Sequence, residues 1–186
     1  MGGGGSKPSK ESVVPVSEVR ESSDEVAPMS SVSKVNERDL IEYYEHQLET
    51  TGRKSDKHGR ALVVDDSKFN RKILGRTIDV FFSDVDFAEN GLEALNMVTI
   101  ALETNNDYSI IFMDSMMPVM GGIEATGMIR DLGFKGMIVG VTGEITPEDN
   151  ARFMASGATD VMLKPLLLPH VESILIGMDM VFFVSK

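Results

Sequence analysis

The sequence predicts an α/β domain in which one parallel five-stranded sheet lies between two layers of helices. Two observations indicate this fold class: from residue 60 onward short apolar runs alternate with helical segments, and 186 residues suffice for one such domain with an extension. Strands that are apolar throughout are typical of parallel sheets covered on both faces. Right-handed crossovers would then wind the sheet into a three-layer sandwich.

The expected elements follow in order along the chain. The strands are expected at Ala61–Val64, Val85–Phe87, Ser109–Met113, Met137–Val141 and Thr159–Leu163. The helices are expected at Lys68–Phe81, Gly91–Glu103, Gly122–Leu132, Pro147–Ser156 and from about Leu168 onward. In sheets of this kind ligands bind beyond the carboxyl ends of the strands, so the residues that follow each strand are the candidates for function.

The chain before this domain divides into three parts. Residues 1–33 contain nine Ser, four Gly and three Pro but no aromatic residue, a composition that predicts disorder. Residues 34–51 are expected to form a short amphipathic helix, because apolar side chains recur there at helical spacing. These side chains are Leu40, Ile41, Tyr44 and Leu48. Residues 52–59 are polar and bounded by glycines, which indicates a linker to the domain at 60–186.

The first residues, MGGGGSK, fit the pattern for myristoylation of Gly2. Four glycines followed by a serine are equally typical of a flexible linker, so both interpretations stay open. One acyl chain supported by Lys7 and Lys10 would give only reversible membrane binding. Lipidation of Gly2 is therefore the one route by which we expect contact with a membrane.

Composition and charge exclude several classes of protein. With 18 Lys+Arg against 29 Asp+Glu, the formal net charge is −11, which repels phosphate backbones and argues against nucleic acid as a partner. The absence of cysteine excludes disulfides, thiolate metal sites and cysteine nucleophiles, and it favours a reducing, cytoplasmic location. No apolar run reaches the roughly 18 residues of a membrane span, so we expect a soluble chain.

Polar functional groups follow four of the five expected strands, and none is expected after the second. The first strand is followed by Asp65 and Asp66, the third by Asp114, the fourth by Thr142 and the fifth by Lys164. Three carboxylates at one sheet edge repel each other unless a cation lies among them, and hard oxygen ligands suit Mg²⁺. Thr142 and Lys164 suit the oxygens of a phosphoryl group bound to a carboxylate. Each residue alone is ordinary in a turn or cap, but together they predict a phosphoryl-transfer site.

From Arg60 to the C-terminus, the sequence resembles the receiver domain of two-component response regulators. The resemblance is carried by LVVDDSKFNRKIL, IIFMDSMMPVMGGIEAT, IVGVTGEITPEDN and ASGATDVMLKPL. The stretches MPVMGG and SGATDVMLKP look most like receivers of hybrid histidine kinases. The resemblance implies a flavodoxin-like, doubly wound sheet with strand order 2-1-3-4-5 and helices on both faces.

The resemblance also implies a role for each residue at the strand ends. Asp114 would be the phosphoacceptor, with a histidine kinase or a histidine phosphotransfer protein as the donor. Mg²⁺ would be bound by Asp66, Asp114 and the backbone carbonyl of Met116, and Asp65 would act through a coordinated water. Thr142 and Lys164 would bind the phosphoryl oxygens, and the Lys164–Pro165 peptide resembles the cis peptide of the family. Such a domain is a signalling module that assists its own phosphotransfer and dephosphorylation, and it signals to a downstream partner by protein contact.

Two positions depart from the family pattern. Val161, three residues before Lys164, stands where many members have an aromatic ring that reports phosphorylation. Met116 stands where some members have a polar group that handles the hydrolytic water, which leaves Glu144 as the polar member of that pair. We therefore expect slow loss of the phosphoryl group.

Three other functions are alternatives to this one. A phosphatase of the haloacid-dehalogenase type would need an acid two residues after Asp114, where Met116 stands. A flavodoxin would need a Ser/Thr/Gly-rich phosphate loop after the first strand, where two acids stand. A receiver-like scaffold without phosphotransfer stays open as an alternative. No output domain is expected, so the chain is either a stand-alone carrier or the tail end of a hybrid kinase.

Overall fold

A computed structural model describes residues 1, 46 and 58–184 of the chain, and the side chains up to residue 176. The predictions of a disordered extension at 1–33, a helix at 34–51, a linker at 52–59 and lipidation of Gly2 therefore fall almost wholly outside the described residues. Within these segments His46 is described as helical and exposed. His58 and Gly59, which were expected in the linker, belong to the first strand.

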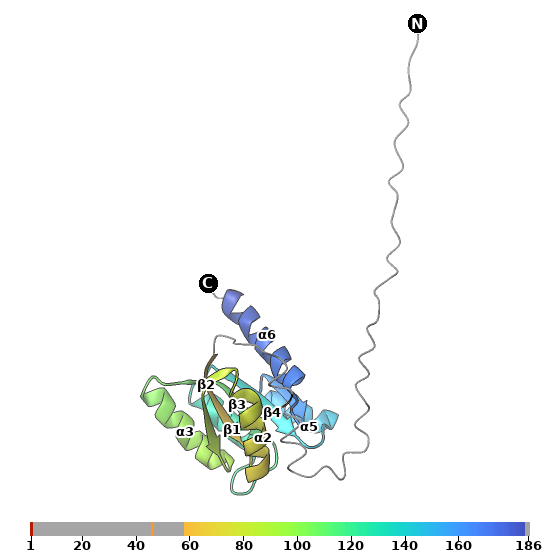
Figure 1. The fold of residues 1–186 in the computed structure, drawn as a ribbon. Helices are drawn as coiled ribbons and strands as arrows, with labels where there is room; N and C mark the ends of the chain where they lie inside the picture. Colours follow the sequence, from red (N-terminus) through yellow and green to blue (C-terminus); the bar gives the residue numbers. More distant parts are fainter. Residues whose placement is uncertain (2–45, 47–57, 185–186) are drawn as a thin grey trace. The chain divides into compact units, whose positions relative to one another are not determined.

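Strands and helices alternate regularly through the described domain (Figure 1). The strands are β1 (His58–Val64), β2 (Phe82–Ala88), β3 (Tyr108–Asp114), β4 (Met137–Thr142) and β5 (Asp160–Leu163). The helices are α2 (Lys68–Ile78), α3 (Gly91–Glu103), α4 (Gly122–Asp131), α5 (Pro147–Ala155) and α6 (Leu168–Val184). All strand pairs are parallel and their order is β2-β1-β3-β4-β5, which confirms the predicted flavodoxin-like sheet.

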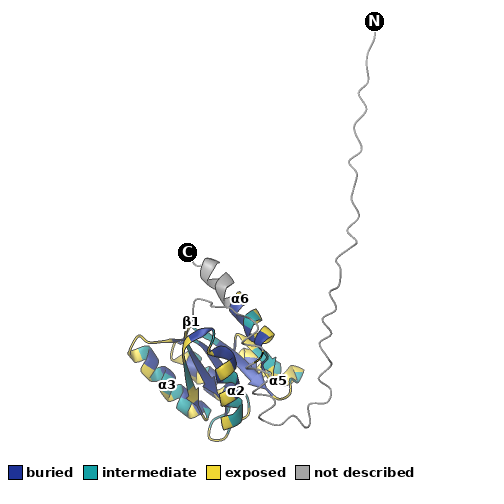
Figure 2. Ribbon diagram, in the orientation of Figure 1, coloured by how far each residue is buried: buried dark blue, intermediate teal, exposed yellow. Residues whose placement is uncertain are grey.

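The sheet separates two hydrophobic cores, because successive side chains of a strand point to opposite faces. Ala61 and Val63 of β1 join a core that α2 and α6 cover. Leu62 and Val64 join a second core that α3, α4 and α5 cover. Figure 2 shows the resulting pattern, with buried residues along the central strands and exposed residues on the outer sides of the helices. The three-layer sandwich is thus the one that the apolar strands predict.

The edge strand β2 differs most from its predicted form. We expected Val85–Phe87, whereas the strand begins at Phe82 and includes Ser83 and Asp84. An edge strand pairs on one side only, so its polar residues remain in contact with water and give no continuous apolar run. Helix α2 correspondingly ends at Ile78 rather than Phe81.

Helices α2, α3 and α5 each follow a loop at the carboxyl end of a strand, and each has a side-chain N-cap. Ser67, Asn90 and Thr146 accept hydrogen bonds from backbone N–H groups of α2, α3 and α5, respectively. Such caps hold the loops at the carboxyl edge of the sheet in defined positions. Among the described residues, no helix combines the length and apolar character that a membrane span requires.

Candidate functional site

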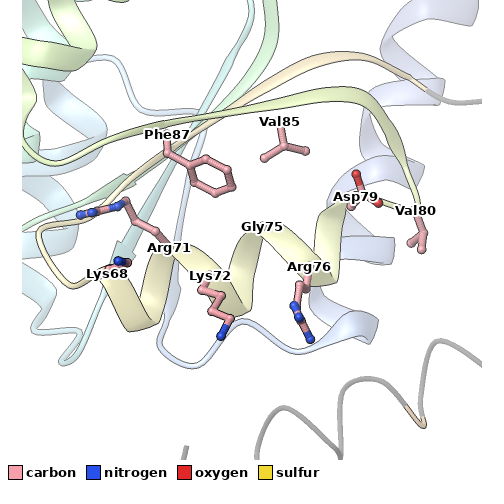
Figure 3. A pocket seen from close by; sticks show the side chains of 9 residues that line it. All are labelled: Lys68, Arg71, Lys72, Gly75, Arg76, Asp79, Val80, Val85 and Phe87. Atoms are coloured by element: carbon pink, nitrogen blue, oxygen red, sulfur yellow. The ribbon is translucent and has the colours of Figure 1, made fainter.

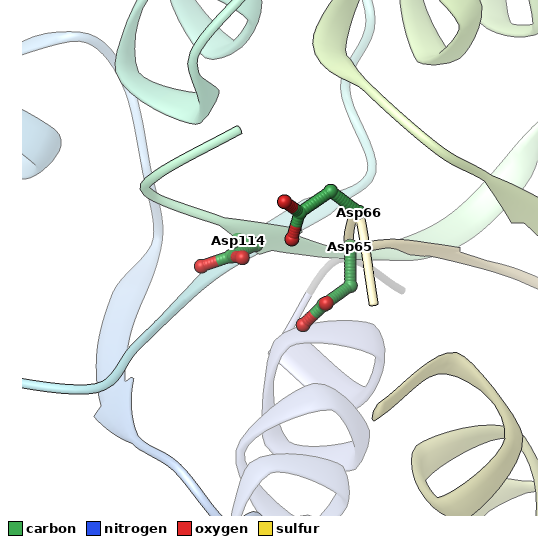
Figure 4. A group of neighbouring side chains, drawn as sticks. All are labelled: Asp65, Asp66 and Asp114. Atoms are coloured by element: carbon green, nitrogen blue, oxygen red, sulfur yellow. The ribbon is translucent and has the colours of Figure 1, made fainter. Parts of the chain in front are cut away.

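The ends of the neighbouring strands β1 and β3 bring three carboxylates together. Asp65, Asp66 and Asp114 each place an oxygen within 4.8 Å of the others (Figure 4). Asp65 and Asp114 are both 5% exposed, whereas Asp66 is exposed to solvent. The sheet order makes these strand ends adjacent, although the residues lie far apart in the sequence.

Lys164 reaches this cluster from the loop after β5. Its Nζ lies 2.6 Å from Oδ2 of Asp65 and 2.8 Å from Oδ2 of Asp114. The Lys164–Pro165 peptide that follows it is cis, as the family resemblance implied. One ammonium group faces three carboxylates, so the cluster carries an excess of negative charge.

Burial and the contacts with Lys164 together set the pKa directions of the groups in this cluster. Burial raises the pKa of Asp114 above its ordinary value, and the Lys164 ammonium offsets this only in part. Burial lowers the pKa of Lys164, but hydrogen bonds to Asp114 and Asp65 outweigh it and raise the pKa overall. A further cation beside these carboxylates would favour their charged forms.

Asp65 is held in place by the first turn of α2. The backbone N–H of Ser67 donates to its Oδ1 at 2.8 Å, and the Asn70 side-chain amide donates to both carboxylate oxygens at 3.1 Å. Asn70 was not among the residues predicted for the site. It lies five residues after Asp65, in the first turn of the helix that begins beside this acid, and this spacing could have indicated a contact between the two side chains.

Arg71 and Glu89 were also missed. The Arg71 guanidinium donates to the backbone carbonyl of Asp65 at 2.7 Å and to that of Asp66 at 3.2 Å, and it forms an ion pair with Glu89. Glu89 directly follows β2, so the expectation that the second strand end carries no functional group is wrong. The strand expected at 85–87 stops one residue before the true end at Ala88, so Glu89 was not recognised as the residue that follows it. Arg71 thereby ties the Asp65–Asp66 loop to the neighbouring strand.

Thr142 lies at the end of β4, which pairs with β3, the strand that ends in Asp114. Its hydroxyl forms hydrogen bonds with neighbouring loop residues. It donates to the carbonyl of Glu144 at 2.8 Å and accepts from the Ser115 hydroxyl at 3.1 Å. The Thr142 carbonyl accepts from the Lys164 backbone N–H at 2.7 Å, but in the described part of the chain no hydrogen bond joins the Thr142 hydroxyl to Asp114 or Lys164. The structure therefore places Thr142 next to the cluster, with the hydroxyl turned toward the loop after β4.

The loop after β3 wraps closely around Asp114. The Met116 N–H donates to Oδ1 of Asp114 at 3.4 Å, while the Met116 side chain is 80% exposed. A Cβ on Gly122 would lie 1.9 Å from the Asp114 carbonyl oxygen, so only glycine permits α4 to begin there. Val119 in the same loop has φ 69°, a strained value for a β-branched residue. Between this loop and α5 lies a recess of about 860 Å³ that includes Asp114, Thr142 and Lys164 in its lining.

The donor set fits a small, hard divalent cation. Carboxylate oxygens from Asp65, Asp66 and Asp114 are the ligand type that Mg²⁺ prefers, and one of the three faces solvent, which suits an ion that retains water ligands. The excess negative charge favours any such cation. The arrangement brings together Asp65, Asp66, Asp114 and Lys164, with Thr142 lining the same recess as Asp114 and Lys164, and it adds Asn70, Arg71 and Ser115. Gly2 lies outside the described residues.

This sheet, with an acidic cluster and a lysine at its carboxyl edge, defines a signalling module of the two-component type. Residues 61–175 match the response regulator receiver domain, and the chain belongs to this family. Over 115 residues it is 36% identical to two-component response regulator 24 of Arabidopsis thaliana, a match that covers 62% of this chain and 80% of that protein. It is 35% identical over 112 residues to the autoinducer 2 sensor kinase/phosphatase LuxQ of Vibrio harveyi, covering 60% of this chain and 12% of that kinase.

Solved structures agree with the fold. The receiver domain of the Arabidopsis thaliana histidine kinase CKI1, complexed with Mg²⁺, is 29% identical, with a TM-score of 0.57 over 64% of this chain and 90% of that one. CheY of Borrelia burgdorferi, from a CheX–CheY–BeF3–Mg complex, has a TM-score of 0.60 at 23% identity, covering 66% of this chain and 90% of that one. The second likeness concerns the fold alone.

Proposed function

We propose that Asp114 accepts a phosphoryl group from a phosphohistidine of a histidine kinase or histidine phosphotransfer protein. The observation that carries this proposal is a buried carboxylate at the end of β3, 2.8 Å from the Lys164 ammonium and within a cluster of three acids. An oxygen of Asp114 attacks phosphorus, the phosphorus–nitrogen bond breaks, and the imidazole leaves with the electron pair of that bond. Membership of the receiver family and the recess beside Asp114 both support this assignment.

In this proposal Asp66, Asp114 and the Met116 carbonyl hold Mg²⁺, and Asp65 acts through a water. Bound Mg²⁺ would supply positive charge to the phosphoryl oxygens. Lys164 exchanges its contact with Asp114 for a phosphoryl oxygen while it remains near Asp65, which is 2.6 Å away. Asn70 and Arg71 are positioning residues, because they hold the side chain of Asp65 and the backbone of the Asp65–Asp66 loop.

The phosphoryl group would be reported through the loop after β4. Thr142 exchanges its bond to the Glu144 carbonyl for a phosphoryl oxygen, and the loop from Gly143 to Pro147 moves with it. Val161 is half-buried and has no ring with which to report the change. A downstream protein would therefore read the face formed by this loop, α5 and β5.

The proposal is tested by asking whether phosphorylation requires the Asp114 carboxylate. The protein is incubated with acetyl phosphate and Mg²⁺, and its intact mass is measured for the wild type, for Asp114→Asn and for Asp107→Asn, a change of an exposed acid just before β3. We expect one phosphoryl group on the wild type and on Asp107→Asn, and none on Asp114→Asn. A phosphorylated Asp114→Asn protein would contradict the acceptor assignment. An unmodified wild type, also after incubation with a phosphorylated histidine phosphotransfer protein, would indicate a scaffold.

The exposed thioether of Met116 leads us to expect a long-lived phosphoryl group, suited to relay. No polar group at this position orients a hydrolytic water, so Met116→Asn should accelerate dephosphorylation about 10-fold. Decay of the radiolabelled protein is followed, with Met128→Asn on α4 as the exposed methionine control. An unchanged decay rate in Met116→Asn would shift the role to Glu144 or another group.

A further inference from the structure

A groove with a basic rim and an apolar floor runs between α2 and the edge strand β2. Its volume is about 750 Å³, and its lining comes from α2, from β2 and from the turn between them (Figure 3). Val85 and Phe87 of β2 and Val80 provide the floor, and Phe87 is 44% exposed. The Phe87 ring lies over Gly75, where a Cβ would come within 2.6 Å of it. A large aromatic ring thus remains partly open to solvent on an uncovered sheet edge.

The rim carries a stripe of positive charge on an otherwise acidic protein. Lys68, Lys72 and Arg76 are spaced four residues apart on α2, which places them on one face of the helix, and all three line the groove. Lys68 and Lys72 form no ion pair within the part of the chain that the structure describes. With a formal net charge of −11, the protein has a local basic stripe that favours an acidic occupant.

The chain itself contains a segment with the complementary pattern, in residues 36–50 outside the described part. Its apolar residues at helical spacing were given above, and Glu42, Glu45 and Glu49 repeat at intervals of three and four residues beside them. At a helical rise of about 1.5 Å per residue, these acids span about 10 Å and the basic stripe about 12 Å. Charge sign, spacing and apolar content all match the groove.

The connection is long enough for this segment to reach the groove. Strand β1 begins at His58, whose N–H donates to the Phe81 carbonyl and which pairs with Phe82, directly after the end of α2. The residues between 50 and 58 can extend over about 25 Å, while α2 is about 16 Å long. A short tether gives a local concentration in the millimolar range, which favours a segment of the same chain over a separate partner.

We propose that residues 36–50 bind as an amphipathic helix in the α2–β2 groove of the same molecule. Leu40, Tyr44 and Leu48 cover Phe87 and Val85, and the glutamates face the basic stripe. The three acids of the phosphoacceptor cluster do not line this groove, although Arg71, which lines it, also bonds to the backbone of Asp65 and Asp66. The proposed binding does not require phosphotransfer.

Hydrogen–deuterium exchange of the full chain tests this binding. Amides at 40–48 should be protected in the wild type, and Lys72→Glu should lower their protection about fivefold, because an attraction becomes a repulsion. Lys135→Glu, an equal charge change at an exposed site far along the sequence, should leave protection unchanged. The double variant Lys72→Glu with Glu45→Lys should restore it.

Other results would overturn the proposal. Absence of protection at 40–48 in the wild type, or equal protection in Lys72→Glu, would show that the segment does not occupy the groove. Protection that rises with protein concentration would assign the groove to a second copy instead.

A disulfide provides a second test, since the natural chain contains no cysteine. The variant Glu45→Cys with Lys72→Cys should oxidise to a disulfide-linked monomer, seen as faster migration in non-reducing electrophoresis. Glu45→Cys with Glu103→Cys, an exposed residue at the end of α3, should not. A disulfide-linked dimer of the first pair, or equal monomer formation by both pairs, would contradict an intramolecular site.

Discussion

Two clusters of charged side chains lie at opposite ends of the same sheet, and they differ in charge balance. Near the amino ends of the strands, Arg60 forms an ion pair with Asp86, and the Tyr108 hydroxyl donates to the same carboxylate at 2.9 Å. The Arg60 guanidinium also lies 4.5 Å from the centre of the Tyr108 ring and donates to the Asn106 carbonyl at 2.7 Å. One cation faces one anion, and the polar atoms are satisfied.

At the carboxyl edge three acids cluster, and in the part of the chain that the structure describes the one cation with an ion pair to them is Lys164, through Asp65 and Asp114. Burying unbalanced charge costs folding free energy, and such cost is retained where a site needs a ligand. The balanced cluster can therefore be explained by stability alone, whereas the unbalanced one indicates a binding site. The comparison teaches that net charge, rather than the number of buried charged groups, distinguishes the two.

The largest expected effect concerns metal binding. Asp66→Asn should weaken Mg²⁺ binding about 100-fold, because it removes both a hard ligand and a negative charge. Asp86→Asn should leave it unchanged, since this acid belongs to the balanced cluster. Isothermal titration calorimetry with MgCl₂ measures both, and equal losses in the two variants would mean that the acidic cluster is not the metal site.

Loss of the cation from the charge-balanced cluster should lower the stability of the fold strongly. Arg60→Ala should lower the free energy of unfolding by about 2 kcal/mol, because Asp86 loses its cation and Tyr108 its stacked guanidinium. Urea denaturation followed by circular dichroism measures this, as the chain has no tryptophan. The control is Lys135→Ala, an exposed residue that should change stability little. A loss no greater than that of the control would show that the cluster contributes nothing to stability.

At the cluster with excess negative charge, removal of one charged group should raise the free energy of unfolding rather than lower it. In EDTA, Asp114→Asn should raise the free energy of unfolding by about 1 kcal/mol, because it removes a buried negative charge and leaves Lys164 with Asp65. Added Mg²⁺ should stabilise the wild type and not the variant. Destabilisation by Asp114→Asn in EDTA would contradict the argument from charge balance.

The smallest effect is confined to alkaline pH. Burial, with the hydrogen bond to Asp86, raises the pKa of Tyr108 from 10.0 to about 12. The folded protein thus keeps a proton that the unfolded chain loses above pH 10, so this stabilisation is complete below pH 10 and disappears as pH rises through about 12. Tyrosinate absorbance of the wild type minus Tyr108→Phe should show a group titrating near 12. A difference titrating at 10 would mean that Tyr108 is accessible to water.

The strand boundaries predicted from the sequence were accurate for two central strands and poor for the edge strand. Strands β3 and β4 were located within one residue at each end, because central strands are apolar throughout. Strand β2 was located poorly, because Ser83, Asp84 and Asp86 remain at a solvated edge. The missed Arg71 and Glu89 have the same origin, since their partnership depends on where β2 ends and on how it lies beside α2.

The fold class, the order of the elements and the residues at the strand ends could all be predicted from the amino-acid sequence. These depend on local patterns: the alternation of apolar runs with helical segments, and the polar residues that follow four of the five strands. The side-chain contacts among these residues depend on the folded structure: the Lys164 ammonium bonds to Asp65 and Asp114, while the Thr142 hydroxyl bonds to Ser115 and to the Glu144 carbonyl. Such contacts depend on strand order and side-chain rotamers, which bring together groups as many as 99 residues apart and which no local pattern encodes.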